Sequence, residues 1–278
     1  MSEVSERFVT TRSGIRVHAV EAGDASSPPV VFVPGWACTA WIFHETIAPF
    51  AQSGFRAIAV ELKGHGLSDK PADPEEYTLE SMRDHLLEVI DALGFEQCGL
   101  VGHSMGAAIS AAAADQNPER ISRLALAAPV GFAGVPGMKL FRAITPRALE
   151  PLLPRLASRS LVRTMLKFVY GSLRQPTHQD VEQFHAPVKL AGYTTALRNL
   201  LHRFNWAAPF PELAIPTITI LGSEDLLSPP ADSEKYYGER RVIEGAGHVL
   251  FDEAPEEMNR LLANFFSPLK ERYISGLK

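Results

Sequence analysis

The sequence lacks the features that mark several classes of protein. Its 278 residues include only two cysteines, Cys38 and Cys98, without the paired spacing of a disulfide framework or a zinc site. The first residues show no basic segment followed by an apolar one, so we expect no signal peptide and a cytoplasmic protein. The most apolar stretch, residues 124–137, is interrupted by Gly and Pro. It is shorter than the ~20 residues that cross a bilayer, so we expect no transmembrane segment.

The chain also lacks an excess of basic residues. It has 27 Lys and Arg against 32 Asp and Glu, a net charge of −5, which argues against nucleic-acid binding by the whole molecule. The charge is uneven, because the segment from Val130 to Trp206 holds 11 basic and 3 acidic residues, or +8, and the remainder carries −13. No internal repeat or low-complexity tract is present, and 46% hydrophobic and 21% charged residues suit an ordinary globular domain.

Short apolar runs alternate with helical patterns along most of the chain. This alternation predicts an α/β fold with a mostly parallel, doubly wound sheet. Residues 1–129 and 207–278 would form this core, and residues 130–206, which are helical in pattern and rich in proline, a helical insertion. The expected strands are 8–11 and 15–21 as a hairpin, then 29–33, 56–62, 98–101, 121–127, 217–221 and 241–243, and the expected helices outside the insertion are 42–53, 79–93, 104–116 and 255–266.

Ser104 is the candidate nucleophile. It lies in Gly102-His103-Ser104-Met105-Gly106, a G-x-S-x-G motif between a predicted strand and a predicted helix. A serine on such a sharp turn presents its hydroxyl outward, and the flanking glycines remove Cβ atoms that would clash. A glycine-rich turn with a helix-capping serine is the purely structural alternative. The side chain of His103 is expected to pack away from Ser104.

A serine hydroxyl needs a base, and the base needs an orienting acid. Both follow Ser104 in the order Ser, acid, His, each just after a predicted strand. Gly222-Ser223-Glu224-Asp225 offers two adjacent acids, of which we favour Asp225, and Gly247-His248 offers the histidine. Glu61, which ends an earlier strand, is expected to be structural.

Acyl transfer also requires donors for the developing oxyanion. The backbone N–H of Met105 is one expected donor, and the backbone N–H of Trp36, after the strand 29–33, is the second.

Five motifs in this order resemble the α/β-hydrolase family, in its capped branch. The resemblance implies Ser104, Asp225 and His248 as a triad, Trp36 and Met105 as an oxyanion hole, and a helical cap over the site. Haloalkane dehalogenases and epoxide hydrolases share this fold but use an Asp nucleophile, so Ser104 argues against both. The motifs are Pro34-Gly35-Trp36, Gly64-His65-Gly66-Leu67-Ser68-Asp69-Lys70-Pro71, Gly102-x-Ser104-x-Gly106, Gly222-x-x-Asp225 and Gly247-His248.

The sequence therefore predicts a serine hydrolase that cleaves a carboxylic ester with an apolar part. A carbon–carbon bond hydrolase, a thioesterase or a lyase would use the same triad, and a non-catalytic hydrolase-fold binding protein is a further alternative. The sequence contains no metal motif and no G-x-G-x-x-G, so no cofactor or metal is expected. The oligomeric state cannot be read from the sequence.

The predicted insertion holds a periodic basic pattern. Arg155, Arg159, Arg163 and Lys167 recur every four residues, which on one continuous helix places them on one face. A solvated ridge is one interpretation, and a basic face toward an anionic substrate or a membrane surface is the other.

Overall fold

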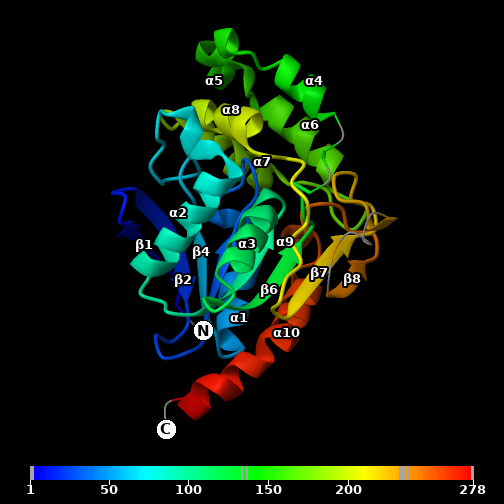
Figure 1. Ribbon diagram of the computed structural model, residues 1–278. Helices are drawn as coiled ribbons and strands as arrows, with labels where there is room; N and C mark the ends of the chain where they lie inside the picture. Colours follow the sequence, from blue (N-terminus) through cyan, green and yellow to red (C-terminus); the bar gives the residue numbers. More distant parts are fainter. Residues whose placement is uncertain (1–2, 133, 136, 232–235, 237, 277–278) are drawn as a thin grey trace.

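The computed structural model describes residues 3–132, 134–135, 137–231, 236 and 238–276. Its centre is an eight-stranded sheet in the order β1-β2-β4-β3-β5-β6-β7-β8 (Figure 1). The strand β2 is antiparallel to β1 and β4, and all the other pairs are parallel, so the predicted mostly parallel sheet and amino-terminal hairpin are confirmed. The strands are β1 (Ser5–Thr10), β2 (Arg16–Ala22), β3 (Pro29–Val33), β4 (Arg56–Val60), β5 (Cys98–His103), β6 (Ile121–Ala127), β7 (Thr217–Gly222) and β8 (Glu239–Ile243).

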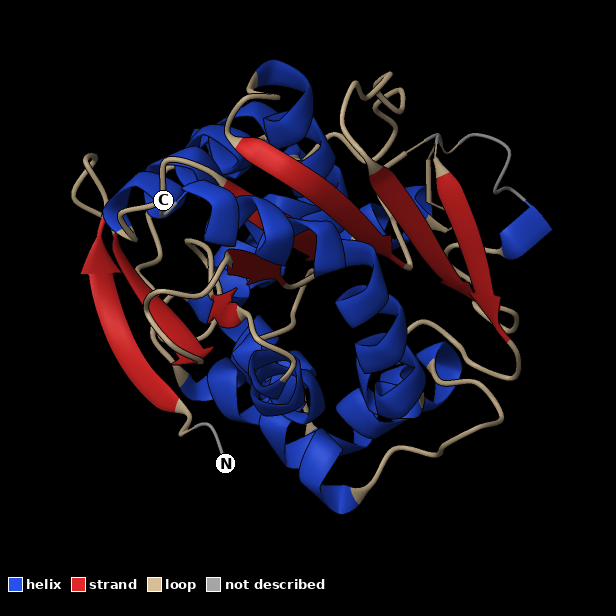
Figure 2. Ribbon diagram, turned by 90° about the horizontal axis from the view of Figure 1, so that it is seen from below, coloured by secondary structure: helices blue, strands red, loops and turns tan. Residues whose placement is uncertain are grey.

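Helices cover both faces of the sheet (Figure 2). The strand β3 is buried at every position, as a parallel strand covered on both faces must be. Val31 and Val33 pack into the core beneath α2 and α3, whereas Val30 and Phe32 pack into the core beneath α1 and α10. The core helices are α1 (His44–Gln52), α2 (Leu79–Ala92), α3 (Met105–Gln116), α9 (Leu250–Glu253) and α10 (Pro255–Gly276), with the 3-10 turns η1 (Ala40–Phe43) and η2 (Pro74–Tyr77).

Local signals explain where these helices begin and end. Thr78 caps α2 by accepting the N–H of Ser81 at 3.1 Å, and Gly94 follows the helix with φ of 83°. The helix α10 is longer than the predicted 255–266 and continues through Pro268. Beyond Phe266, Leu269 is buried and the Lys270 amine donates to the Ser53 carbonyl at 3.0 Å, so tertiary contacts support the added turns.

The chain between β6 and β7 is helical. In Figure 1 its helices lie at the end of the molecule opposite the C-terminus. Arg155 belongs to α5 and not to α6, because the Ser158 hydroxyl accepts the Leu161 N–H at 3.3 Å and starts a new helix. The expectation of one helix with four basic residues on one face was therefore wrong. The elements are α4 (Met138–Ala143), η3 (Arg147–Leu152), α5 (Leu153–Leu156), α6 (Arg159–Val169), α7 (His178–His185), η4 (Ala186–Lys189) and α8 (Tyr193–Arg203).

None of the helices in the described part of the chain combines the length and the apolar character needed to cross a bilayer.

Candidate active site

Ser104 lies in the sharp turn that joins β5 to α3. Its backbone has φ of 55° and ψ of −122°, a conformation that a non-glycine residue adopts at a cost of about 1–3 kcal/mol. A Cβ at Gly102 would lie 2.6 Å from the Ala107 Cα atom, and one at Gly106 would lie 2.3 Å from the Val33 carbonyl oxygen. The turn is therefore possible only with glycine on both sides of the serine, as the motif predicts.

The structure brings Ser104, His248 and Asp225 together from the ends of β5, β8 and β7. The Ser104 Oγ atom lies 2.9 Å from His248 Nε2, and His248 Nδ1 lies 2.8 Å from Asp225 Oδ2. All three residues are buried, with Ser104 retaining 8% of its surface. The imidazole thus bridges a hydroxyl and a carboxylate in the geometry that proton transfer from the serine requires.

The environment of Asp225 keeps its carboxylate ionised. Burial alone would raise the pKa of Asp225, but the His248 ring and hydrogen bonds to the carboxylate together hold the pKa below its ordinary value. The other carboxylate oxygen, Oδ1, accepts the N–H groups of Leu227 at 2.8 Å and Ser228 at 3.1 Å. The carboxylate is therefore fixed in orientation as well as in charge.

The neighbouring acid, Glu224, points elsewhere. Its two carboxylate oxygens accept the N–H and the hydroxyl of Ser172, both at 2.7 Å. Glu224 thus ties the segment after α6 to the loop that carries Asp225. Of the two adjacent acids, it is Asp225 that contacts His248.

The loop after β3 lies directly against Ser104. A Cβ at Gly35 would be 2.7 Å from the Ser104 Cβ atom, so glycine permits this approach. Met105 is the first residue of α3, and its backbone N–H has no acceptor within the helix. The Trp36 side chain donates from Nε1 to the Leu197 carbonyl at 2.9 Å, which joins this loop to α8.

Backbone strain is concentrated around the site. In the described part of the chain the non-glycine residues with positive φ are Ala37, Ser104 and Ala128, at 61°, 55° and 45°. They follow β3, β5 and β6, which are adjacent in the sheet. Strain of this kind persists where the surrounding structure fixes it, and it is frequent at functional sites.

Glu253 holds the backbone on both sides of His248, a role that the sequence did not reveal. Its Oε2 atom accepts the N–H of Gly247 at 3.0 Å and that of Gly171 at 2.7 Å, and its Oε1 atom accepts the N–H of Val249 at 3.0 Å. Burial raises the pKa of Glu253 above its ordinary value, although these hydrogen bonds oppose the rise. An acid five residues after a candidate histidine is the signal that could have suggested this contact.

His103 and Val169 hold the His248 peptide itself. His103 Nε2 donates to the His248 carbonyl at 2.9 Å, and the His248 N–H donates to the Val169 carbonyl at 2.7 Å. Burial lowers the pKa of His103 to about 3, so the ring is neutral near pH 7. Its side chain therefore points to the histidine loop, away from the Ser104 hydroxyl.

Glu61 is held within a network of loop contacts. Its carboxylate accepts the N–H groups of Ala40 at 3.1 Å and Leu67 at 2.7 Å and lies 3.0 Å from His18 Nδ1. The hydrogen bond to Glu61 raises the pKa of His18. Glu61 organises the loop 64–71 and makes no contact with His248.

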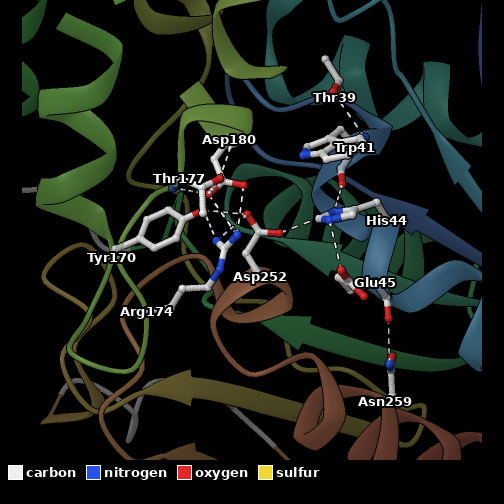
Figure 3. Close-up of polar contacts among 10 residues, drawn as sticks. All are labelled: Thr39, Trp41, His44, Glu45, Tyr170, Arg174, Thr177, Asp180, Asp252 and Asn259. Atoms are coloured by element: carbon white, nitrogen blue, oxygen red, sulfur yellow. Dashed lines mark hydrogen bonds and ion pairs between the residues drawn. The ribbon is translucent and has the colours of Figure 1, made fainter. Parts of the chain in front are cut away.

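A second polar cluster joins the segment after α6 to α9 (Figure 3). The Tyr170 hydroxyl donates to Asp252 Oδ2 at 2.6 Å, and the Arg174 guanidinium lies 3.0 Å from Asp180 and 3.6 Å from Asp252. On the other side, His44 Nδ1 lies 3.6 Å from Asp252 Oδ1 (Figure 3). Asp252 is four residues from His248, so this cluster also holds the loop that carries His248.

Among the residues that the structure describes, no group of three or more His, Cys, Asp or Glu side chains is arranged to hold a metal ion.

Comparison with known proteins identifies similar chains. A model of the alpha/beta hydrolase fold family matches residues 28–255. Bifunctional epoxide hydrolase 2 of Rattus norvegicus is 26% identical over 307 aligned positions, which cover 94% of this chain and 55% of the relative, so this chain spans about half the length of that protein.

The alignments with a further relative and with a solved structure cover a larger share of those two proteins. The 2-hydroxymuconate semialdehyde hydrolase of Pseudomonas sp. strain CF600 is 31% identical over 230 positions, which cover 78% of this chain and 76% of the relative. The crystal structure of wild-type Cfl2 from Burkholderia cenocepacia has a TM-score of 0.81 at 22% identity and covers 95% of this chain and 96% of that chain.

Proposed function

The chain belongs to the alpha/beta hydrolase family, and from this premise we propose that it is a serine hydrolase that cleaves a carboxylic ester through an acyl-enzyme intermediate on Ser104. The observation that carries the proposal is the continuous hydrogen-bonded path from Asp225 through His248 to Ser104, at 2.8 and 2.9 Å. A serine hydroxyl in a turn can be satisfied by one hydrogen bond, so packing alone does not require a histidine that is itself bonded to a buried carboxylate.

In the first step, His248 Nε2 takes the Ser104 proton as Oγ attacks the carbonyl carbon of the ester. Asp225 holds the Nδ1–H tautomer and stabilises the imidazolium that forms. The N–H groups of Trp36 and Met105 stabilise the oxyanion, a contribution worth about 100- to 1,000-fold in rate for each donor. The imidazolium then protonates the departing alcohol, and water repeats the sequence to release the acid.

Residues 130–206 would act as a cap that shapes the substrate site and excludes water. Three contacts support this role: Trp36 with Leu197, Glu224 with Ser172, and His248 with Val169, each joining the segment to a loop that carries a proposed site residue. The Phe141 ring of α4 lies edge-on to Trp36, with ring centroids 6.2 Å apart, which supports an apolar part in the substrate.

Epoxide hydrolysis, the activity in the name of the rat relative, is not proposed for this chain. A carboxylate that opens an epoxide forms an ester, which water can hydrolyse. A serine that opened an epoxide would form an ether, which the same site could not release. Ser104 at this position therefore supports attack on a carbonyl carbon.

A second candidate is hydrolysis of a carbon–carbon bond beside a carbonyl group. The 31% identical relative named 2-hydroxymuconate semialdehyde hydrolase favours it, and the same three residues would serve that reaction. Thioesterase and lyase activities use the same groups but have no specific observation in their favour.

A substrate panel tests the proposal. Purified protein and the Ser104→Ala variant would be assayed on p-nitrophenyl esters of increasing acyl length, on thioesters and on ring-cleavage dienones. Ester hydrolysis that depends on Ser104 is the expected result. Turnover of dienones alone would favour the second candidate, and full ester hydrolysis by Ser104→Ala would refute both.

A further inference from the structure

Exposed apolar side chains are concentrated in one part of the molecule. Within the described residues, nine of the fourteen large apolar side chains exposed to solvent lie between Leu140 and Leu173. Leu140 is 67% exposed and Phe168 is 58% exposed. Scattered exposure of single apolar residues is normal, but a concentration of this kind marks an interaction site.

The helix α6 shows the pattern most clearly. Leu161, Met165 and Phe168 are spaced i, i+4, i+7 and form one exposed stripe along the helix, called here the α6 stripe. Leu166 is the buried residue of this helix and faces the core together with Val162. The apolar arc of this helix is therefore wider than the part that packs against the rest of the protein.

Basic side chains are frequent in the segment that carries the α6 stripe. From Met138 to Val169 the chain has seven basic residues and one acid, Glu150. Arg163 and Lys167 lie on α6 and have no ion-pair partner among the described residues, whereas Arg159 pairs with Glu182. On a helical projection with about 100° per residue, Lys167 lies about 100° from Phe168 and Arg163 about 140° from it, beyond the small hydroxyl residues Ser160 and Thr164.

We propose that the face formed by α4, α5 and α6 docks onto the surface of an anionic phospholipid bilayer. Leu161, Met165 and Phe168 would enter the interface between headgroups and acyl chains, and the unpaired basic residues would contact the phosphates. Residues 138–169, which contain this face, hold seven basic residues and one acid, so their charge of 7 − 1 = +6 favours an anionic surface and would oppose the same face of a second copy. The binding is peripheral and requires no spanning helix.

The position of this face suits docking onto an anionic surface. Figure 1 shows α4, α5 and α6 together at the end of the molecule opposite the C-terminus. The acidic remainder of the chain, at −13, would face away from an anionic bilayer. Docking goes beyond the proposed ester hydrolysis and stands apart from it, because binding is measured without turnover.

Cosedimentation with large unilamellar vesicles tests the proposal on the full chain. Vesicles of phosphatidylcholine alone would be compared with vesicles that also contain phosphatidylglycerol. We expect binding only to the anionic vesicles and release at about 0.5 M salt, because screening weakens charge attraction. Replacing Arg163 and Lys167 together by Glu should weaken binding by at least fivefold for each residue, roughly the contribution of one basic side chain near such a surface.

The apolar part has its own variant and matched controls. Leu161→Ser with Phe168→Ser should weaken vesicle binding by about tenfold or more, while far-ultraviolet circular dichroism and thermal melting stay unchanged because both side chains are exposed. Val242→Ser, at a residue 49% exposed on β8, and Arg12→Glu should bind as the parent does. No binding of the parent to anionic vesicles, or equal binding by the α6 variants, would overturn the proposal. Self-association of the parent that the α6 variants abolish, without vesicle binding, would also overturn it in favour of a second copy.

Discussion

Glu253→Gln gives a quantitative test of how the histidine loop is held. The carboxylate accepts three backbone N–H groups, those of Gly171, Gly247 and Val249, at 2.7, 3.0 and 3.0 Å. A glutamine that keeps its carbonyl oxygen toward Gly171 and Gly247 must turn its amide NH2 toward the N–H of Val249. One buried hydrogen bond to a charged acceptor is then lost, and its donor is left without a partner.

A lost bond of this kind costs about 1.5–3 kcal/mol. Removing a buried charge whose pKa is already raised returns part of that cost, so we expect a loss of ~2 kcal/mol in the free energy of unfolding. For a chain of this length that loss lowers Tm by roughly 4–8 °C. Val249 follows His248 directly, so the imidazole also loses part of its support. A displacement of the ring approaching 1 Å would lower kcat by about 100-fold with little change in KM.

Two assays measure these effects separately. Thermal melting gives the stability change, and kcat on a p-nitrophenyl ester, measured well below the Tm of the variant, gives the effect on positioning. Glu88→Gln is the matched control, because Glu88 accepts the N–H of Ser13 at 3.3 Å far from His248. Parent-like kcat in Glu253→Gln would refute the claim that Glu253 positions the histidine, and an unchanged Tm would refute the energy assigned to the lost bond.

Three further changes test other parts of the site. Asp225→Asn should lower kcat by about 10,000-fold with the fold intact by circular dichroism, because an amide donor facing Nδ1 leaves the proton on Nε2, where it blocks the base; a loss below tenfold would contradict this role. Gly35→Ala should lower kcat by ~100-fold, because its Cβ would lie 2.7 Å from the Ser104 Cβ atom and displace the donor loop; unchanged kcat would show that the loop does not support the reaction. The hydrogen bond with Glu61 is the first cause that raises the pKa of His18. The protonated His18 therefore stabilises the fold fully below the ordinary pKa of 6.5, and this contribution is lost as pH rises through the raised pKa. Urea unfolding at about pH 6 and about pH 9 should therefore show a smaller decline in stability for His18→Gln than for the parent, and equal declines would remove this ion pair from the account.

The parts of the fold that depend on local pattern could be predicted from the sequence. The strands at Pro29–Val33 and Ile121–Ala127 have the predicted bounds, because each contains a short apolar run that the sheet buries, at every position of β3 and from Leu124 to Ala127 in β6. The serine turn could be predicted because the G-x-S-x-G motif between a strand and a helix is a local signal, although the Cβ that Gly106 avoids would meet the Val33 carbonyl oxygen on β3, outside the motif.

The contacts that tertiary packing creates could not be predicted. Glu253 and Gly171 are 82 residues apart in the chain, and no periodicity connects them. The position of Asp225 in Gly222-x-x-Asp225 favoured it over Glu224 in advance, but the contact of Glu224 with Ser172, from a distant segment, could not be read from the sequence. The break between α5 and α6 was missed because the spacing of the basic residues continues through Ser158, although Ser158 is itself a common helix cap.

Labelling with a fluorophosphonate, followed by intact mass measurement and peptide mapping, tests the central claim most directly. The account predicts one adduct per chain, located on Ser104, with no adduct in the Ser104→Ala variant and strongly slowed labelling in His248→Asn. Folded protein that stays unlabelled, or that is labelled equally in Ser104→Ala, would contradict the assignment of Ser104 as the nucleophile.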